Sequence, residues 1–284
     1  MNNLTIEELQ QFSYRLAIPS IITLVVNLFG LTTLGLIISV AIHIIVLGIF
    51  FVLFKEYKSA FLKFILAGLI LCLAGEVVIF FNLDHVSYGT VYWAFLAIHC
   101  ARNIVLGLAY GWNVLKSPIF NPFWIKAVPV IVIIPIFFIL QFVVFSQETS
   151  YKIVFILYNL TLCFMLVTAG LRYDHTSQRS FIIMICAAVA FILSEVAYFW
   201  LFVTDGSDPN TFTAFRAPLL QLGSCLLVSG TVDHVLHHKL TQKNKIYIKM
   251  TDRDDNTLRG KIGPLTKNIN NIPVGKTKFK EPLI

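Results

Sequence analysis

Charged residues are scarce in this chain of 284 residues, in which Asp, Glu, Lys and Arg make up 13%. Soluble domains carry about 25% charged residues, so this chain has about half the usual share. Hydrophobic residues make up 57% of it, against roughly 45–50% in soluble domains. The composition argues against a soluble globular domain, a disordered chain and a coiled coil, and it predicts a membrane protein with several spans.

The chain also lacks the sequence motifs of several enzyme classes. It has no Gly-x-Ser-x-Gly elbow, no P-loop, no Gly-x-Gly-x-x-Gly turn and no His-Glu-x-x-His pair, so a serine lipase, a nucleoside triphosphatase and a zincin have no support. Its five cysteines show no Cys-x-x-Cys spacing and fall in apolar stretches, so neither disulfides nor a zinc site is predicted. We expect no metal and no cofactor, and carboxylates are the chemical groups that remain.

Long apolar stretches follow one another through most of the chain. A helix that crosses a bilayer needs about 20 mostly apolar residues. This requirement predicts an all-α membrane protein with eight transmembrane helices, at about 16–32, 34–54, 60–81, 90–114, 124–146, 151–171, 180–203 and 214–235. The first two come from one block that is too long for a single span, and Asn27, Gly30 and Gly35 offer a turn near its middle.

Lysine and arginine are unevenly shared between the predicted loops. They collect in alternate loops, whereas the other loops contain only Lys152 and Arg216 and are otherwise neutral or acidic. Because basic residues are enriched on the cytoplasmic side of membrane proteins, the pattern supports eight spans with both termini in the cytoplasm. The chain then divides into a cytoplasmic segment 1–15, a transmembrane domain 16–236 and a basic cytoplasmic tail 237–284, which we expect to be mostly disordered.

The whole net charge of +7 lies in the tail. Residues 239–284 hold 11 Lys and Arg against 4 Asp and Glu, and the rest of the chain is balanced. We expect the tail to contact anionic lipid headgroups beside the membrane. Binding of nucleic acid is not expected, because the basic residues stand next to a predicted bilayer.

Two glutamates lie inside predicted spans, where an ionisable residue costs about 2.5–3.5 kcal/mol on insertion. Glu76 and Glu195 have similar surroundings, LAGLILCLAGEVVIFF and ICAAVAFILSEVAYFW, with small residues one and eight positions before each carboxylate. Small residues let helices approach closely in a bilayer, so we expect both carboxylates to face the bundle interior. Their separation of 119 residues is close to half of the transmembrane domain and is consistent with a 4+4 repeat.

Other polar residues in the predicted spans have several interpretations. His99 and Arg102 share a face of the fourth span, because residues three apart are neighbours on a helix. Arg102 would neutralise a glutamate or bind a phosphate, and the simpler alternative is a pair that only satisfies two buried charges. We interpret His43 as a packing or interface residue. The group Asp233, His234, His237 and His238 has the spacing of metal ligands, but it coincides with the end of the last span and is interpreted as a solvated helix end.

Four spans resemble motifs of the YhhN-like lysoplasmalogenases. The third span is similar to that family's AGL…S…GD motif, and the fourth, AFLAIHCARNIVLGLAY, places His99 on the motif histidine. The seventh, AAVAFILSEVAYF, resembles GA…F…SD, and the eighth, LLQLGSCLLVSGT, resembles the closing span. The chain departs from the family in two ways: both aspartates are glutamates, Glu76 and Glu195, and Arg102 or Asn103 stands where a tyrosine is frequent.

The resemblance implies a membrane hydrolase that cleaves the vinyl ether bond of lysoplasmalogens to a fatty aldehyde and a glycerophospho-base. It implies that Glu76 and Glu195 serve as general acid and as the carboxylate that stabilises the cation and activates water, in an order that the sequence does not fix. His99 would orient a carboxylate or relay a proton, and Arg102 and Asn103 would bind the lysophospholipid substrate.

Non-enzymatic alternatives stay open: a proton-coupled transporter or sensor, and an inactive relative that binds lipid. Transporters tend to have helices broken by Gly or Pro at the binding site. Here Pro129 and Pro135 lie in the fifth predicted span, and the two helices that carry the glutamates contain no proline. This distribution favours the enzyme.

Overall fold

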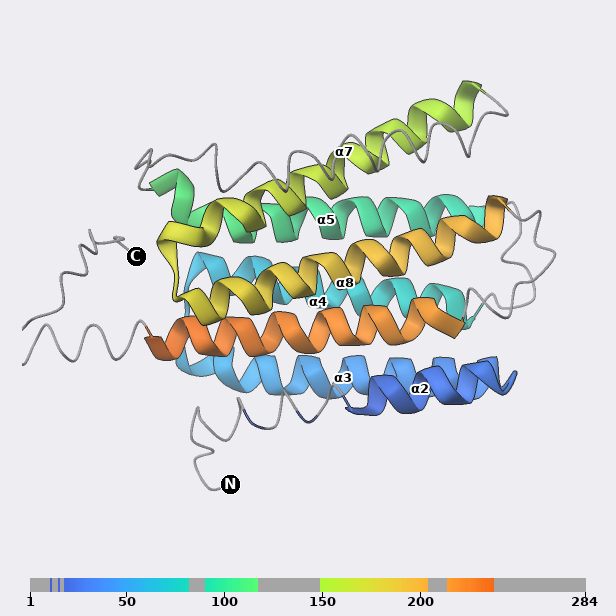
Figure 1. Cartoon of the computed structure of the whole chain (residues 1–284), viewed down its shortest axis with the longest axis horizontal. Helices are drawn as coiled ribbons and strands as arrows, with labels where there is room; N and C mark the ends of the chain where they lie inside the picture. Colours follow the sequence, from blue (N-terminus) through green and yellow to red (C-terminus); the bar gives the residue numbers. More distant parts are fainter. Residues whose placement is uncertain are drawn as a thin grey trace, which may run out of the picture.

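The chain folds as a bundle of long helices that run along a common direction (Figure 1). The computed structural model describes residues 11, 15, 18–81, 90–116, 149–203 and 214–237. Within these residues the secondary structure is helical: α2 (Ile18–Leu28), α3 (Thr32–Glu56), α4 (Ala60–Phe80), α5 (Thr90–Lys116), α7 (Thr149–Leu171), the 3-10 helix η2 (Arg172–His175), α8 (Gln178–Val203) and a C-terminal helix, Ala214–His237. The predicted all-α class is confirmed.

Five of the described helices are long and apolar enough to cross a membrane. They correspond to most of α3, α4, α5 and α8 and to the C-terminal helix, whereas α2 and the apolar part of α7 (Ile156–Leu171) are shorter. These helices are those of an integral membrane protein. The predicted span 124–146, the segment 1–10 and the tail from 238 onward lie outside the described residues, so the count of eight spans and the 4+4 repeat stay predictions.

Most helix ends lie within two residues of the predicted spans, and α2 is the exception. The first span was predicted to run to residue 32, whereas α2 ends at Leu28. Gly30 forms the turn with φ +78°, a left-handed conformation that glycine adopts without strain. The N–H groups of Gly30 and Leu31 donate to the carbonyls of Asn27 and Val26 at 2.9 and 3.2 Å. This turn closes α2 and separates it from α3.

The outer face of the bundle is apolar and polar side chains lie inside. On α2 the buried residues are Ser20, Thr23 and Asn27, whereas the isoleucines of the same helix are between about half and two-thirds exposed. In water this arrangement would expose apolar surface and bury polar groups. In a bilayer it is the favourable one, because the apolar face meets lipid and the polar groups bond to one another.

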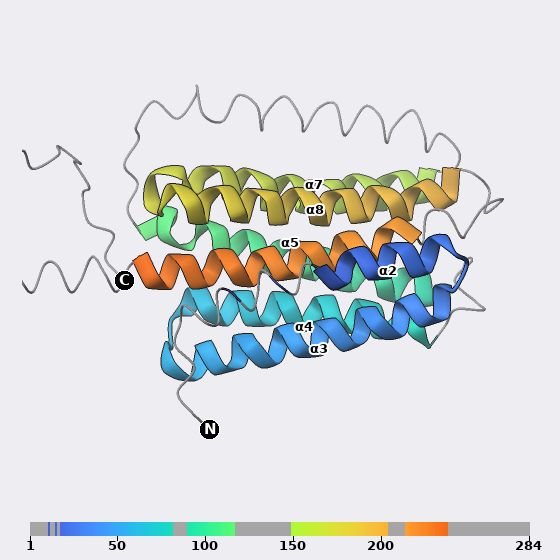
Figure 2. The same ribbon diagram turned by 60° about the horizontal axis from the view of Figure 1, so that its bottom comes forward.

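Small residues allow the central helices to pack closely. Figure 2 shows α7 and α8 on one side of the bundle and α3 and α4 on the other. A Cβ at Gly68 of α4 would lie 2.4 Å from the Leu106 side chain of α5. A Cβ at Gly107 of α5 would lie 2.4 Å from the Phe164 ring and 3.4 Å from the Cα of Met165 in α7. These glycines therefore set the spacing of α4, α5 and α7.

Replacing Gly107 by leucine is expected to destabilise the bundle. The added side chain meets a ring and a neighbouring backbone, and overpacking of this kind costs about 1–3 kcal/mol. Gly48→Leu in α3 is the matched control, because a Cβ at Gly48 has nothing within 4 Å. Thermal unfolding in detergent should show a lower Tm for Gly107→Leu only. Equal Tm values for the two variants would contradict the packing described here.

Candidate active site

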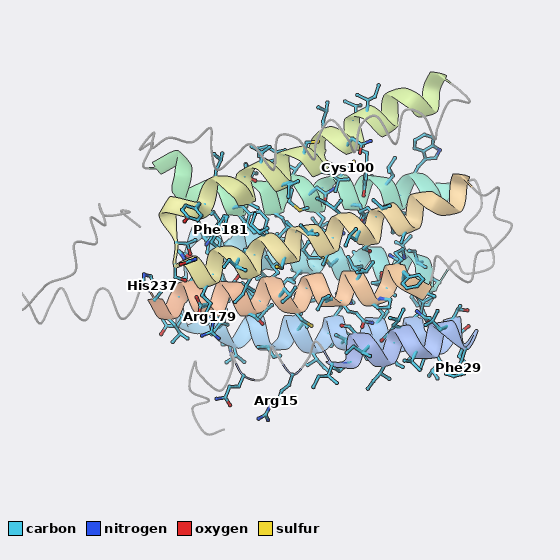
Figure 3. The ribbon with its side chains drawn as sticks, in the orientation of Figure 1. Arg15, Phe29, Cys100, Arg179, Phe181 and His237 are labelled. Atoms are coloured by element: carbon cyan, nitrogen blue, oxygen red, sulfur yellow. The ribbon has the colours of Figure 1, made fainter. Side chains whose placement is uncertain are left out.

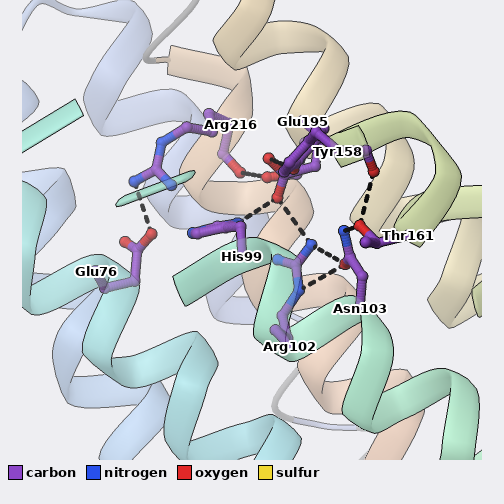
Figure 4. A network of polar contacts seen from close by, with 9 residues as sticks. Glu76, His99, Arg102, Asn103, Tyr158, Thr161, Glu195 and Arg216 are labelled. Atoms are coloured by element: carbon purple, nitrogen blue, oxygen red, sulfur yellow. Dashed lines mark hydrogen bonds and ion pairs between the residues drawn. The ribbon is translucent and has the colours of Figure 1, made fainter. Parts of the chain in front are cut away.

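Glu195 joins three helices through its carboxylate. It lies on α8 with 1% of its surface exposed. Its Oε1 is 2.5 Å from Nδ1 of His99 and 2.9 Å from Nη2 of Arg102, both on α5. The hydroxyl of Tyr158 on α7 donates to the other oxygen, Oε2 (Figure 4). Both oxygens are therefore bonded, and the negative charge faces a guanidinium.

Glu76 forms a similar cluster from the other helices. It lies on α4 and is fully buried. Nη2 of Arg216 on the C-terminal helix donates to Oε1 at 2.6 Å, and the Ser39 hydroxyl of α3 donates to Oε2 at 2.8 Å. Both predicted carboxylates thus face the bundle interior, and each is paired with an arginine and a hydroxyl.

The hydroxyl donors of the two clusters stand at the same sequence distance from their glutamates. In each cluster the hydroxyl donor precedes its glutamate by 37 residues, Ser39 before Glu76 and Tyr158 before Glu195. The arginines are exchanged: Glu76 pairs with Arg216 from the second half of the chain, and Glu195 pairs with an arginine from the first half. Each glutamate is thus bonded to an arginine from the other half of the chain, and the 4+4 repeat stays a prediction.

His99 lies between the two carboxylates (Figure 4). Its Nδ1 faces Glu195, and its Nε2 is buried and has no hydrogen-bond partner among the described residues. A Cβ at Gly75 would lie 2.6 Å from Nε2, so this nitrogen approaches α4 directly beside Glu76. The ring also packs on Phe95, with centroids 3.9 Å apart. The small residue before Glu76 therefore makes room for the histidine.

Arg102 is held in one orientation by its neighbours. Its Nε and Nη2 donate to Oδ1 of Asn103 at 3.1 and 2.7 Å, and Nδ2 of Asn103 donates to Thr161 at 3.3 Å. The guanidinium also lies 5.0 Å from the centroid of the Phe191 ring. Nη1 has no hydrogen-bond partner in the described structure. The Nη1 group of Arg102 can therefore donate hydrogen bonds to a ligand, while the rest of the guanidinium is held in place.

Sequence reasoning missed Arg216 and Tyr158. The loop count assigned Arg216 to an outer loop, whereas it lies on the C-terminal helix, is 2% exposed and binds Glu76. The signal for it was weak: it is one of only two basic residues in that set of loops, and it falls within the predicted eighth span. Tyr158 had no signal in the sequence, because nothing local to it indicates a carboxylate 37 residues away.

The interpretation of His43 as a packing residue was incomplete. His43 is 1% exposed. Its Nδ1 contacts the Ser39 carbonyl at 2.9 Å and its Nε2 contacts the Ser224 hydroxyl at 3.1 Å. It therefore fixes the part of α3 that carries the hydroxyl donor to Glu76.

The end of the last helix is less solvated than predicted. Asp233 is 8% exposed, accepts a bond from Ser177 at 2.8 Å and pairs with Arg179 at 3.7 Å. His234 contacts Thr176 at 3.1 Å. In the residues that the structure describes, no group of three or more His, Cys, Asp and Glu side chains is placed to hold a metal ion, and His238 lies outside those residues. This end connects the C-terminal helix to the loop before α8.

The pairing of Glu76 with Arg216 predicts strong coupling between these two residues. Glu76→Gln alone leaves a buried guanidinium without a counter-charge, which should lower the free energy of unfolding by about 3–5 kcal/mol. Adding Arg216→Met to Glu76→Gln should restore most of that loss, as measured by thermal unfolding of the two single variants and the double variant in detergent. An ion pair whose cation is exposed gives the control: the Arg179 side chain is 63% exposed, and Arg179→Met should cost less than about 1 kcal/mol. Additive effects of Glu76→Gln and Arg216→Met would contradict the pairing.

Comparison with known proteins places the chain in a family. The model of the YhhN family matches residues 36–205, which is more than half of the chain. No curated protein and no solved structure matches the chain. The matched segment includes α4, α5, α7 and α8 and thus both glutamates, His99 and Arg102, so the resemblance stated from the motifs is confirmed. The protein belongs to the YhhN family.

Proposed function

We propose that this protein is an integral membrane hydrolase that cleaves the vinyl ether bond of lysoplasmalogens, such as lysoplasmenyl-ethanolamine or lysoplasmenyl-choline. The products are a fatty aldehyde and a glycerophospho-base. One observation carries the proposal: a histidine whose Nδ1 faces Glu195 and whose unpartnered Nε2 approaches α4 at Gly75, the residue before Glu76. We also place both termini in the cytoplasm, on the distribution of basic residues in the loops.

The first step is transfer of a proton to the alkene. The proton adds to the vinyl carbon that is not bonded to oxygen, and the π electrons form the new C–H bond. The other vinyl carbon becomes an oxocarbenium cation that shares its charge with the ether oxygen. A protein catalyses this step by presenting an acid to the alkene and negative charge to the cation.

His99 is better placed than either glutamate to deliver this proton. Each carboxylate already accepts hydrogen bonds from a hydroxyl and lies against a guanidinium. The imidazole has one nitrogen on Glu195 and the other without a partner. In the same way a carboxylate orients the histidine of a catalytic triad through Nδ1 and leaves Nε2 to exchange protons with the substrate.

The second step adds water to the cation. A water molecule bonds to the oxocarbenium carbon and returns a proton to Nε2 of His99, which restores the acid. The resulting hemiacetal then breaks its C–O bond to the glycerol oxygen: the hemiacetal hydroxyl gives up its proton and becomes the aldehyde carbonyl, and the glycerol oxygen takes up a proton and leaves as a hydroxyl. The negative charges of Glu76 and Glu195 flank the position of His99 (Figure 4) and would stabilise the cation between the two steps, as paired carboxylates do at glycosidic bonds.

The predicted substrate-binding pair divides its roles in this proposal, with Arg102 binding the substrate and Asn103 positioning Arg102. Nη1 of Arg102 is buried and unpartnered, and a guanidinium bonds well to phosphate oxygens. Asn103 accepts two bonds from that guanidinium and would hold Nη1 toward the headgroup. In this role Asn103 orients the arginine rather than contacting the lipid itself.

An aldehyde assay with purified protein in lipid nanodiscs tests the proposal. With lysoplasmenyl-ethanolamine the protein should release a fatty aldehyde, and His99→Asn should lower kcat by about 10²–10⁴-fold because the proton donor is removed. Glu76→Gln and Glu195→Gln should also lose most activity. His237→Asn and Cys186→Ser are matched controls with exposed side chains and should retain it. The saturated alkyl ether analogue should not react, since it has no alkene to protonate.

Retention of full activity by both glutamate variants would exclude the mechanism. A chain that releases no aldehyde would point to the second candidate, a proton-coupled transporter or sensor, or to a lipid-binding relative. The same buried carboxylates, arginines and histidine would then carry protons through the bundle. Proteoliposomes with a pH-sensitive dye inside separate these cases, because only the transporter acidifies the lumen when a lysophospholipid and a proton gradient are supplied.

A further inference from the structure

A third buried arginine lies at the opposite end of the bundle from the glutamates. Arg172 is the first residue of η2 and is 1% exposed. In the described structure, its Nε, Nη1 and Nη2 all lack a hydrogen-bond partner. A guanidinium carries five N–H donors and no acceptor, and it stays protonated in proteins. The Arg172 side chain is therefore a buried cation whose N–H donors make no hydrogen bond in the described structure.

Side chains from several helices surround Arg172. The guanidinium carbon lies 4.7 Å from the centroid of the Phe61 ring of α4. The His234 ring of the C-terminal helix meets the edge of the same phenylalanine, with centroids 5.2 Å apart. The Tyr110 hydroxyl of α5 is also buried without a hydrogen-bond partner, and it lies within electrostatic reach of the guanidinium.

Arg172 remains charged at neutral pH. Burial lowers its pKa to about 10, which is still well above neutrality. An unpaired buried charge costs several kcal/mol, whereas a cation–π contact contributes about 0.5–2 kcal/mol. The Phe61 ring therefore offsets only part of the penalty.

The other two buried arginines show how this chain normally pairs such a charge. Arg102 lies 2.9 Å from a Glu195 oxygen, and Arg216 lies 2.6 Å from a Glu76 oxygen. Among the described residues no carboxylate forms an ion pair or hydrogen bond with Arg172, and Asp233 of the C-terminal helix is bonded to Ser177 and Arg179 instead. An external anion would supply the counter-charge that the described residues do not give Arg172.

This position is far from the candidate active site. Along α8, 17 residues separate Gln178 from Glu195, which is about 26 Å at 1.5 Å per residue. Along α4, 15 residues separate Phe61 from Glu76, or about 22 Å. Figure 3 places Arg179 and His237 at this end of the bundle and Phe29 at the other. A ligand at Arg172 would therefore not be the group that reacts beside His99.

We propose that Arg172 and Tyr110 form a binding site for a phosphate oxyanion, at the end of the bundle where α4 begins and α7 ends. The planar fork of the guanidinium matches two phosphate oxygens. The Tyr110 hydroxyl donates to a further oxygen, and Phe61 forms the apolar wall. The phosphate comes from a lipid headgroup or from a soluble phosphate, and the two sources share this chemistry. The site is independent of the hydrolase proposal.

Thermal unfolding of the full chain, purified in a detergent free of phosphate and phospholipid, tests the site. One arm adds inorganic phosphate at constant ionic strength against chloride, and the other adds phosphatidic acid in mixed micelles. At a hundredfold excess over Kd, either probe should raise the Tm of the wild-type chain by about 5 °C. A rise with phosphate identifies a soluble ligand, and a rise with the lipid alone identifies a headgroup.

Variants show whether Arg172 is responsible. Arg172→Met should remove the rise, and without ligand its Tm should equal or exceed that of the wild type, because an unpaired buried charge is gone. Tyr110→Phe should weaken the binding several-fold. It is the second test of the site if Arg172→Met does not fold. Arg179→Met removes the same charge from an exposed side chain nearby and should keep the full rise. No rise with either probe, or an undiminished rise in Arg172→Met, would overturn the proposal.

Discussion

The burial of charge inside an apolar bundle is the constraint on which this structure depends. A carboxylate or guanidinium in a bilayer costs several kcal/mol unless a partner of opposite charge lies beside it. Glu76 and Glu195 each meet this condition with an arginine from a distant helix. These contacts connect α4 to the C-terminal helix and α5 to α8, so the charges that the membrane disfavours are also those that join the two halves of the chain.

The same pairing arranges the chemistry. A guanidinium and a hydroxyl already bond to each carboxylate. The imidazole of His99 therefore has Nδ1 oriented by Glu195, and its Nε2 has no hydrogen-bond partner among the described residues. Gly75 makes this possible, since any larger residue would meet the ring. Arg172 has a buried charge that no carboxylate of the described residues pairs with, and this contrast with Arg102 is the basis for proposing an external anion at the far end.

Much of the bundle and part of the site followed from the sequence. Apolar length located the helices to within about two residues, because the thickness of a bilayer sets a minimum span. The first helix was predicted too long. Apolar residues continue through the turn at Gly30, and hydropathy alone does not show where the chain turns from one helix into the next. Glu76 and Glu195 were expected in the interior, and His99 and Arg102 on one face of a span. All four are buried inside the bundle, because ionisable side chains in a span avoid lipid.

The sequence by itself determined that this is an all-helical membrane protein of the YhhN family with two carboxylates, a histidine and an arginine inside it. Only the tertiary structure decided which cation meets which anion. Arg216 lies 140 residues from Glu76, and Tyr158 reaches Glu195 from another helix. Local pattern reports the face on which a side chain lies, whereas an ion pair between helices depends on their packing and rotation, which arise from contacts distributed over the whole bundle.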